Sequence, residues 1–159
     1  MLTKEKFIQL SQQYMDDIFR FAFSCVKSKA DADDVTQIVL LRLYETDKTF
    51  ESDCHLKNWL IRVTLNECRK YWRSPWRRTE DFTEYASSIP FESSGHSDVF
   101  DAVMSLDQKY RVVIFLYYYE GYAVKEIANL LKIPQGTVGI RLKRAKEQLR
   151  KILSEEAYL

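Results

Sequence analysis

The chain has 159 residues, of which 46% are hydrophobic and 30% charged, with a formal net charge of +1. This composition is typical of one ordinary folded domain or two small ones, and it excludes disorder throughout. No apolar run approaches the roughly 20 residues of a membrane span, and Lys4, Glu5 and Lys6 occupy the place of a signal peptide's apolar centre. We therefore expect a cytoplasmic protein without membrane insertion.

Apolar spacing predicts helices along most of the chain, so the expected fold class is all-α. In residues 4–25, apolar side chains recur at steps of three and four: Phe7, Leu10, Tyr14, Ile18, Phe21 and Cys25. Residues 32–44 repeat this spacing, and Asp31 and Asp33 stand where acidic side chains favour a helix start. No sustained alternation of apolar and polar residues indicates a sheet.

The weakest helical signal lies in residues 79–97, which are polar, acidic and interrupted by Pro90 and Gly95. Such a composition is typical of a flexible linker. We therefore expect two small helical domains, residues 1–78 and 98–159, joined by residues 79–97. Each is close to the lower size limit for independent stability.

The charges are segregated along the chain although their sum is small. Residues 62–78 carry six basic side chains against Glu67, and residues 132–151 carry seven against Glu147. Residues 79–110 carry seven acidic side chains against Lys109. The two basic segments are therefore candidate nucleic-acid surfaces.

The first basic segment combines arginines with aromatic rings. In a helix after His55, Leu56, Leu60 and Val63 form an inward edge, and another edge within about 80° of arc presents Trp59, Arg62, Asn66, Arg69 and Arg73. Tyr71, Trp72 and Trp76 follow. This pattern suits single-stranded nucleic acid, whose bases stack on rings while guanidinium groups hold phosphates. Taken alone, Trp59 is better explained as a core residue, because large aromatic side chains are usually buried.

The second basic segment follows a helix-turn-helix pattern. A helix over residues 124–131 and a turn ending at Pro134 precede a long basic helix. That helix turns Val138, Leu142, Ala145, Leu149 and Ile152 inward, and Gly136, Ile140, Lys143, Arg144 and Lys151 to the opposite face, which would enter a major groove. The alternative is a merely solvated face. Residues 112–119 are predicted to form a core helix beneath the motif.

No catalytic constellation is evident, so we expect no enzymatic activity and no cofactor. The sequence has two scattered histidines and no glycine-rich phosphate loop. Cys54, His55 and Cys68 are the nearest approach to a set of zinc ligands, but a fourth ligand is missing and the spacing matches no common site. With Cys25, the cysteines are an odd, scattered set that suits reduced thiols, and no metal is expected.

Three motifs in order resemble the extracytoplasmic function (ECF) group of bacterial RNA polymerase sigma factors. They are residues 31–37 (DADDVTQ), residues 58–63 (NWLIRV) ending at Asn66, and Gly136-Thr137-Val138 with Arg141-Leu142 and Arg144-Ala145. The resemblance implies that the first domain is sigma region 2, which binds polymerase core and the melted minus-ten element. It implies that the second is region 4, a four-helix, winged-helix-like helix-turn-helix domain that reads the minus-thirty-five element as duplex.

The resemblance also implies roles for individual residues. Polymerase core would bind Asp34, Gln37, Ile38, Leu41 and Arg42. Minus-ten DNA would bind Trp59, Arg62, Asn66, Arg69, Lys70 and Arg73, with residues 50–57 as the loop that captures an unstacked base. Minus-thirty-five DNA would bind Gln135, Gly136, Thr137, Ile140, Arg141, Lys143 and Arg144. The implied partners are the clamp helices and flap region of the polymerase, promoter DNA and an anti-sigma factor.

The sequence departs from the family pattern at three positions. Gly139 and Ile140 stand where the family has a basic residue and a small hydroxyl residue, which removes a phosphate contact and bears on minus-thirty-five recognition. Ile38 replaces an acid beside Gln37. The main rival interpretation is a two-domain helix-turn-helix regulator that does not join core polymerase. A protein-interaction adaptor is the third.

Overall fold

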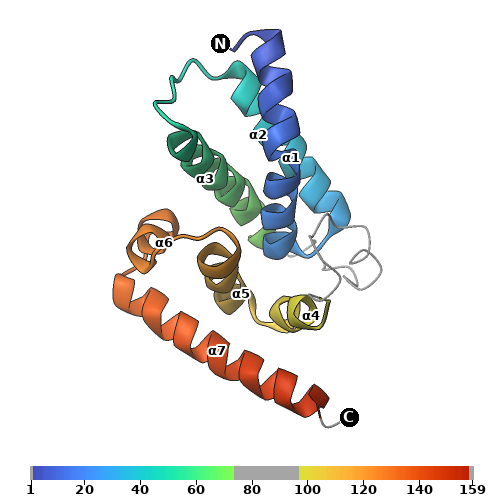
Figure 1. The fold of residues 1–159 in the computed structure, drawn as a ribbon, viewed down its shortest axis with the longest axis vertical. Coiled ribbons are helices and arrows are strands. Elements are labelled where there is room, and N and C mark those ends of the chain that lie inside the picture. Colours follow the sequence, from blue (N-terminus) through green and yellow to red (C-terminus); the bar gives the residue numbers. More distant parts are fainter. Residues whose placement is uncertain (1, 74–96, 158–159) are drawn as a thin grey trace. The chain divides into compact units, whose positions relative to one another are not determined.

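The computed structural model describes residues 2–73 and 97–157, which belong to two compact units within residues 1–91 and 92–159 (Figure 1). The described residues are helical and contain no strand, which confirms the all-α prediction. Trp76, Pro90, Gly95 and all of the predicted linker except Ser97 lie outside the described residues.

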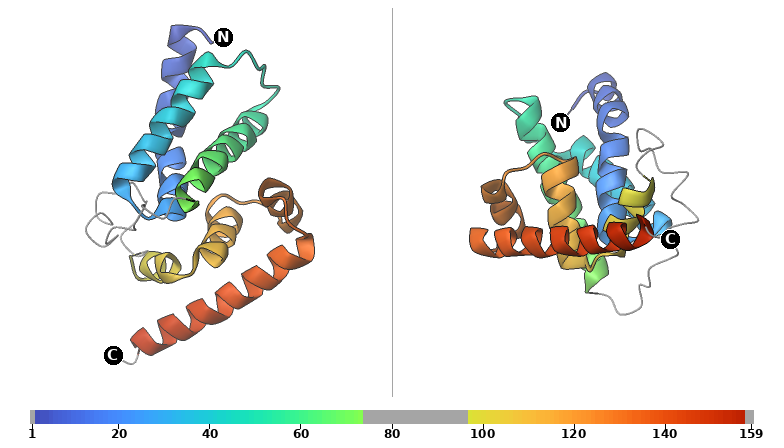
Figure 2. Two further views of the ribbon diagram at one scale, coloured as in Figure 1. Left: turned by 180° about the vertical axis from the view of Figure 1, so that it is seen from behind. Right: turned by 60° about the horizontal axis from the view of Figure 1, so that its bottom comes forward.

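The first unit consists of three helices, α1 (Lys4–Val26), α2 (Lys29–Glu45) and α3 (Asp53–Trp72). In Figures 1 and 2, α1 and α2 lie side by side and α3 packs against both. Their inner faces meet in an apolar core that includes Leu10, Ile18 and Phe21 of α1, Val35, Val39 and Leu43 of α2, and Leu56, Leu60, Ile61 and Leu65 of α3. Burying each such side chain stabilises the unit by about 1.5–3 kcal/mol. Phe7, the first residue of the predicted stripe, is half-buried with its ring edge-on to Tyr44.

A hydroxyl side chain caps the start of each of these helices. Thr3 accepts the N–H of Lys6, Ser28 accepts that of Asp31 at 3.2 Å, and Ser52 accepts that of His55 at 3.0 Å. The second helix therefore begins at Lys29, earlier than the acidic residues alone predicted, because Ser28 satisfies an N–H of its first turn. For the same reason the loop prediction for residues 50–57 is wrong beyond Ser52, since α3 begins at Asp53.

Trp72 links the end of α3 to the end of α1. Helix α1 stops at Val26 because Lys27 adopts the left-handed conformation, with φ 55°. The last carbonyls of a helix lack partners within it, and the indole N–H of Trp72 donates to one of them, the Cys25 carbonyl, at 2.8 Å. Trp72 was predicted as part of a nucleic-acid surface. It is half-buried, and its hydrogen bond supports the packing of the first unit.

The second unit is built on the long helix α7 (Gln135–Ala157), against which α4 (Ser97–Ser105), α5 (Gln108–Ile114) and α6 (Val124–Leu131) pack. Figure 1 shows α6 beside the first turns of α7 and α4 nearer its far end, and Figure 2 shows the same order. Val138, Leu142 and Ala145 are buried as predicted, whereas Leu149 and Ile152 are half-buried.

The predicted core helix over residues 112–119 is only partly confirmed. Val112 to Leu116 are buried, but residues 115–119 form a π-helical segment, η4 (Phe115–Tyr119), closed by the Glu120 N–H on the Phe115 carbonyl at 3.0 Å. This wider turn accompanies outward placement of three tyrosines, Tyr117, Tyr118 and Tyr119, which are 36%, 55% and 36% exposed.

We predict that Trp72→Phe destabilises the first unit by about 0.5–1.5 kcal/mol, because the ring is retained but the Cys25 carbonyl loses its donor. Urea unfolding of the full chain, followed by the fluorescence of the remaining tryptophans, measures the change. All three tryptophans, Trp59, Trp72 and Trp76, precede the second unit, so their emission reports on the N-terminal part of the chain. An unchanged midpoint would show that the hydrogen bond contributes nothing.

Candidate nucleic-acid and protein interfaces

Helix α2 presents an outward face opposite its buried one. Asp34, Gln37, Leu41 and Arg42 are exposed and Ile38 is half-buried. Leu41 is 55% exposed, although leucine is a residue that usually packs inside. The structure therefore brings all five residues predicted for polymerase binding onto one face. An apolar side chain among polar ones on such a face suits a protein partner.

Arg42 has a partner within the first unit that the sequence did not reveal. Its guanidinium Nη2 lies 2.6 Å from Oε1 of Glu67 in α3, and the Glu67 side chain is only 2% exposed. Lys70 also contacts this carboxylate, with Nζ 3.1 Å from Oε2. A buried carboxylate needs such partners, because an unpaired buried charge is strongly destabilising. Arg42, predicted to bind polymerase, thus also helps to hold α2 and α3 together, and Lys70, predicted to bind DNA, pairs with the same carboxylate from within α3.

Helix α3 presents a second outward surface, which we call the α3 strip: Arg62, Asn66, Arg69, Lys70 and Arg73. All are exposed except Arg69, which is half-buried. The inward edge predicted for this helix is also found, since Leu56, Leu60 and Val63 are buried. The described part of the first basic segment therefore does form a continuous, mainly cationic surface.

The α3 strip is internally hydrogen-bonded. Arg69 Nη1 donates to the amide oxygen of Asn66 at 2.8 Å, and Arg73 Nε donates to the Arg69 carbonyl at 3.3 Å. The first bond engages the oxygen of the Asn66 amide and so orients the group. The amide NH2 can then donate outward. An amide held in this way can offer donors to the acceptor atoms of a base.

An aromatic cluster borders the strip. The ring of Phe50 lies edge-on to both His55 and Trp59, with centroids 5.4 Å apart in each pair. The backbone N–H of Glu51 donates to His55 Nδ1 at 3.1 Å, which anchors the loop to the first turn of α3. Trp59 is half-buried, so its ring is neither fully enclosed in the core nor fully exposed for stacking on a base.

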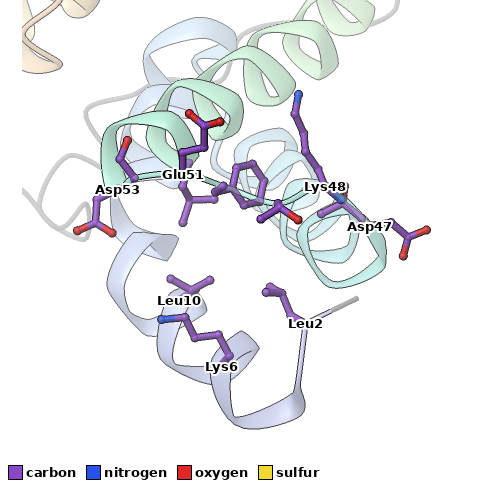
Figure 3. A pocket seen from close by; sticks show the side chains of 12 residues that line it. Leu2, Lys6, Leu10, Asp47, Lys48, Glu51 and Asp53 are labelled. Carbon is purple, nitrogen blue, oxygen red and sulfur yellow. Dashed lines mark hydrogen bonds between the residues drawn. The ribbon is translucent and has the colours of Figure 1, made fainter.

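Beneath this loop lies a cavity of about 470 Å³ between residues 46–53 and the start of α1. Figure 3 shows Leu2, Lys6 and Leu10 of the N-terminal segment facing the loop, with Asp47, Lys48 and Glu51 on the opposite side. Phe50 also lines the cavity and therefore connects it to the aromatic cluster. Its lining is mixed, with apolar side chains such as Leu2 and Leu10 beside charged ones such as Lys6 and Asp47.

The three residues considered as zinc ligands are not brought together. Cys54 is exposed, whereas Cys68 is buried and contacts Cys25. Burial is the main cause that raises the pKa of the Cys68 thiol, and hydrogen bonding to Cys25 adds to it. Within residues 2–73 and 97–157, no three His, Cys, Asp or Glu side chains are arranged to hold a metal ion.

In the second unit, α6, a tight turn and α7 form the predicted helix-turn-helix. The Glu126 carboxylate accepts the N–H of Ala123 at 3.0 Å before α6. The turn is made by Lys132, which adopts the left-handed conformation with φ 58°, and the N–H of Ile133 donates to the Ala128 carbonyl. Ala128 and Ile127 are buried in the unit, as predicted.

Helix α7 presents the predicted basic face. Gln135, Gly136, Ile140, Lys143 and Arg144 are exposed, and Thr137 and Arg141 are half-buried. Ile140 is 53% exposed at the centre of this face. All seven residues predicted for duplex recognition therefore lie on the outer side of the second helix of the motif.

A tyrosine surface on η4 was missed by sequence reasoning. Lys146 of α7 lies over the rings of Tyr117 and Tyr118, 5.8 and 5.6 Å from their centroids. An apolar cavity of about 470 Å³ adjoins it, lined by Val99 and Val103 of α4 and by Tyr118, Tyr119 and Leu149. Burial raises the pKa of Tyr119. Three consecutive tyrosines after an apolar run were the available signal, since tyrosine is enriched at protein interfaces.

The described residues contain no helix long and apolar enough to cross a membrane. The Sigma-70 region 2 model matches residues 10–78, and the Sigma-70 region 4 model matches residues 97–149. The RNA polymerase sigma-E factor of Streptomyces coelicolor is 30% identical over 96% of this chain and 87% of its own length.

The chain belongs to the ECF RNA polymerase sigma factors. The ECF sigma factor SigW of Bacillus subtilis is 27% identical over 96% of this chain and 91% of its own length. The fold is also that of the sigma factor RpoE from Bartonella quintana, solved in complex with the anti-sigma factor NepR. The TM-score is 0.72 at 22% identity, covering 94% of this chain and 98% of that one.

Membership in this sigma family answers the main rival interpretation. Sigma factors direct RNA polymerase to promoters and are non-enzymatic initiation factors, which favours this function over a regulator that does not join polymerase. The two matched regions fall on the two compact units. The sigma family thus supplies the general activity.

We predict that Gly139→Ala stabilises the second unit by about 1 kcal/mol, because glycine weakens a helix interior and an added Cβ would meet no atom within 4 Å. Gly121→Ala is the matched control, and it should destabilise the second unit. It also has open space, but its φ of 78° strains any side chain. Hydrogen exchange of the α7 amides in the full chain checks both variants. A destabilised Gly139→Ala would contradict the assignment of Gly139 to a regular helix.

Proposed function

We propose that this sigma factor divides promoter recognition between its two units. The first unit, sigma region 2 (residues 1–78), binds polymerase core through α2 and the melted minus-ten strand through α3. The second, region 4 (residues 98–159), reads minus-thirty-five duplex through α7, and residues 79–97 connect the two. The observation that carries the proposal is the difference between the two cationic surfaces. The α3 strip includes an amide and adjoins aromatic rings, whereas the α7 face follows a helix-turn-helix.

The outward face of α2 is the proposed contact with the clamp helices of polymerase. Leu41 supplies exposed apolar area at its centre, and Asp34 and Gln37 supply charge and hydrogen bonding. Ile38 adds apolar area where an acid would be usual in the family. Arg42 lies on the same face, with its guanidinium already paired with Glu67. Such an apolar centre with polar surroundings is the usual organisation of a protein interface.

The α3 strip is the proposed minus-ten surface. Arg62, Arg69, Lys70 and Arg73 hold the backbone of the melted strand, because cationic side chains track phosphates without reading sequence. Asn66, oriented by Arg69, and Trp59, beside Phe50, are placed to contact an unstacked base. The cavity under residues 46–53 lies next to this cluster and is the proposed position of that base.

The outward face of α7 is the proposed minus-thirty-five surface. Gln135, Thr137, Arg141 and Arg144 supply donors for base edges and phosphates, with Lys143 beside them and Gly136 allowing close approach of the backbone. Gly139 replaces a basic side chain, so this helix offers one phosphate contact fewer than the family pattern.

Further partners follow from the sigma family. We infer that the flap region of polymerase contacts the chain, that an anti-sigma factor binds it, and that it acts in the cytoplasm. The anti-sigma proposal is supported by the RpoE structure, which is a complex with the anti-sigma factor NepR. A partner that covered the α2 face or the α3 strip would block initiation directly.

Run-off transcription with polymerase core on a library of promoter sequences tests the proposal. Core plus this chain should give new transcripts that core alone does not give. Leu41→Asp should weaken core binding by about tenfold or more, because it places a charge at the apolar centre of the α2 face. Ile8→Asp is the matched control, since it places the same charge on a similarly exposed apolar residue (45%) of another helix, α1. Failure of the wild-type chain to join core would refute the proposed function.

We predict that Ile140 contacts a thymine methyl group, the one apolar group that the major groove offers. The wild-type chain should bind minus-thirty-five duplex more tightly with thymine than with uracil at the contacted position. Ile140→Ser should lose that preference, which anisotropy of labelled duplexes measures. If the wild-type chain bound both duplexes equally, Ile140 would have no such contact.

A further inference from the structure

Glu67 is the most deeply buried acidic side chain on α3, and it lies between two of the proposed surfaces. Its side chain is 2% exposed, so its charge requires partners inside the first unit. The structure gives it two cations, Arg42 and Lys70. Arg42 belongs to the α2 face proposed for polymerase, and Lys70 to the α3 strip proposed for DNA. One carboxylate is therefore shared by residues of two interfaces.

The two cations are not equivalent. Arg42 reaches Glu67 from another helix, at 2.6 Å, through a guanidinium that is always charged and can offer several donors to a carboxylate. Lys70 is three residues away on the same helix, at 3.1 Å, and its side chain is 59% exposed. A lysine at the surface end of a flexible stem gives up such a bond at little cost. Because Glu67 must keep at least one partner, Arg42 is the one suited to stay.

We propose that Glu67 regulates the DNA affinity of the α3 strip by sharing Lys70 with the DNA backbone, while Arg42 remains its permanent counter-ion. This rests on the proposed function, in which the strip holds a single strand. In the free chain Lys70 is partly neutralised by Glu67. When a DNA phosphate binds, Lys70 leaves the Glu67 carboxylate and pairs with the phosphate. The net gain in binding free energy is therefore smaller than an unpaired lysine would give.

The sharing also limits what Arg42 can do at the polymerase interface. A polymerase carboxylate that drew Arg42 away would leave Lys70 as the remaining described partner of Glu67, and so would weaken the strip. Docking through Asp34, Gln37 and Leu41 avoids this conflict. Arg42 is therefore a positioning residue for α2 and α3.

A double-mutant cycle on the full chain tests the proposal, with anisotropy of a short, labelled, mixed-sequence single-stranded oligonucleotide at low salt. Glu67→Gln should tighten binding by about threefold to tenfold, because it removes the charge that competes for Lys70. Lys70→Met should weaken binding and lower the salt slope by about 0.7. In the Lys70→Met background, Glu67→Gln should change affinity no more than the control.

The control is Glu45→Gln, which makes the same change of net charge at an exposed residue of α2. The proposal would be overturned if Glu67→Gln raised DNA affinity no more than Glu45→Gln does, or if its full rise in affinity persisted in the Lys70→Met background. Either result would show a general effect of net charge. Absence of binding by every variant would also overturn it.

Unfolding of the full chain separates folding from affinity. Arg42→Met should lower the midpoint of unfolding more than Lys70→Met does, because, of the two cations, Arg42 alone pairs with Glu67 from another helix. The reverse order would show that Lys70 is the permanent partner. Run-off transcription with the wild-type chain tests the proposed function on its own, so a chain that initiates transcription but shows no coupling refutes this inference alone.

Discussion

The buried carboxylate of Glu67 sets a condition that the first unit must meet. A charge taken out of water is tolerated only with close partners, so α2 and α3 must bring Arg42 and Lys70 to it. Hydrophobic burial is non-directional. The Arg42 contact has a short range and a definite direction, and therefore helps to select one register of α2 against α3.

That register decides which residues face outward. Because each helix of a three-helix unit buries one face, Val35, Val39 and Leu43 turn Gln37 and Leu41 to the exterior. On α3, Leu56 and Leu60 turn Arg62 and Asn66 outward in the same way. The proposed functional surfaces thus follow from the packing of the core, and a change inside the unit can alter binding without any contact to a ligand.

Helical periodicity was sufficient to predict much of this arrangement from the sequence. It identified α1, α2, α3, α6 and α7, the inward stripe through Val138 and Leu142, and the exposure of Arg62 and Ile140, because these depend on spacing within one segment. The caps were less well predicted, since Ser28 and Ser52 act through single hydrogen bonds. The Arg42–Glu67 pair and the Trp72–Cys25 bond could not be predicted, because they join residues far apart in the sequence.

The π-helical turn of η4 has an evolutionary consequence. Such a turn holds one residue more than the α-helical turn it replaces, so a single-codon deletion within residues 115–119 would restore regular pitch and remove the outward bulge that the three tyrosines occupy. The aromatic surface beside Lys146 would then be lost in one genetic step, with the hydrophobic composition of the segment nearly unchanged. Closely related chains can thus differ in this surface while their sequences remain almost identical.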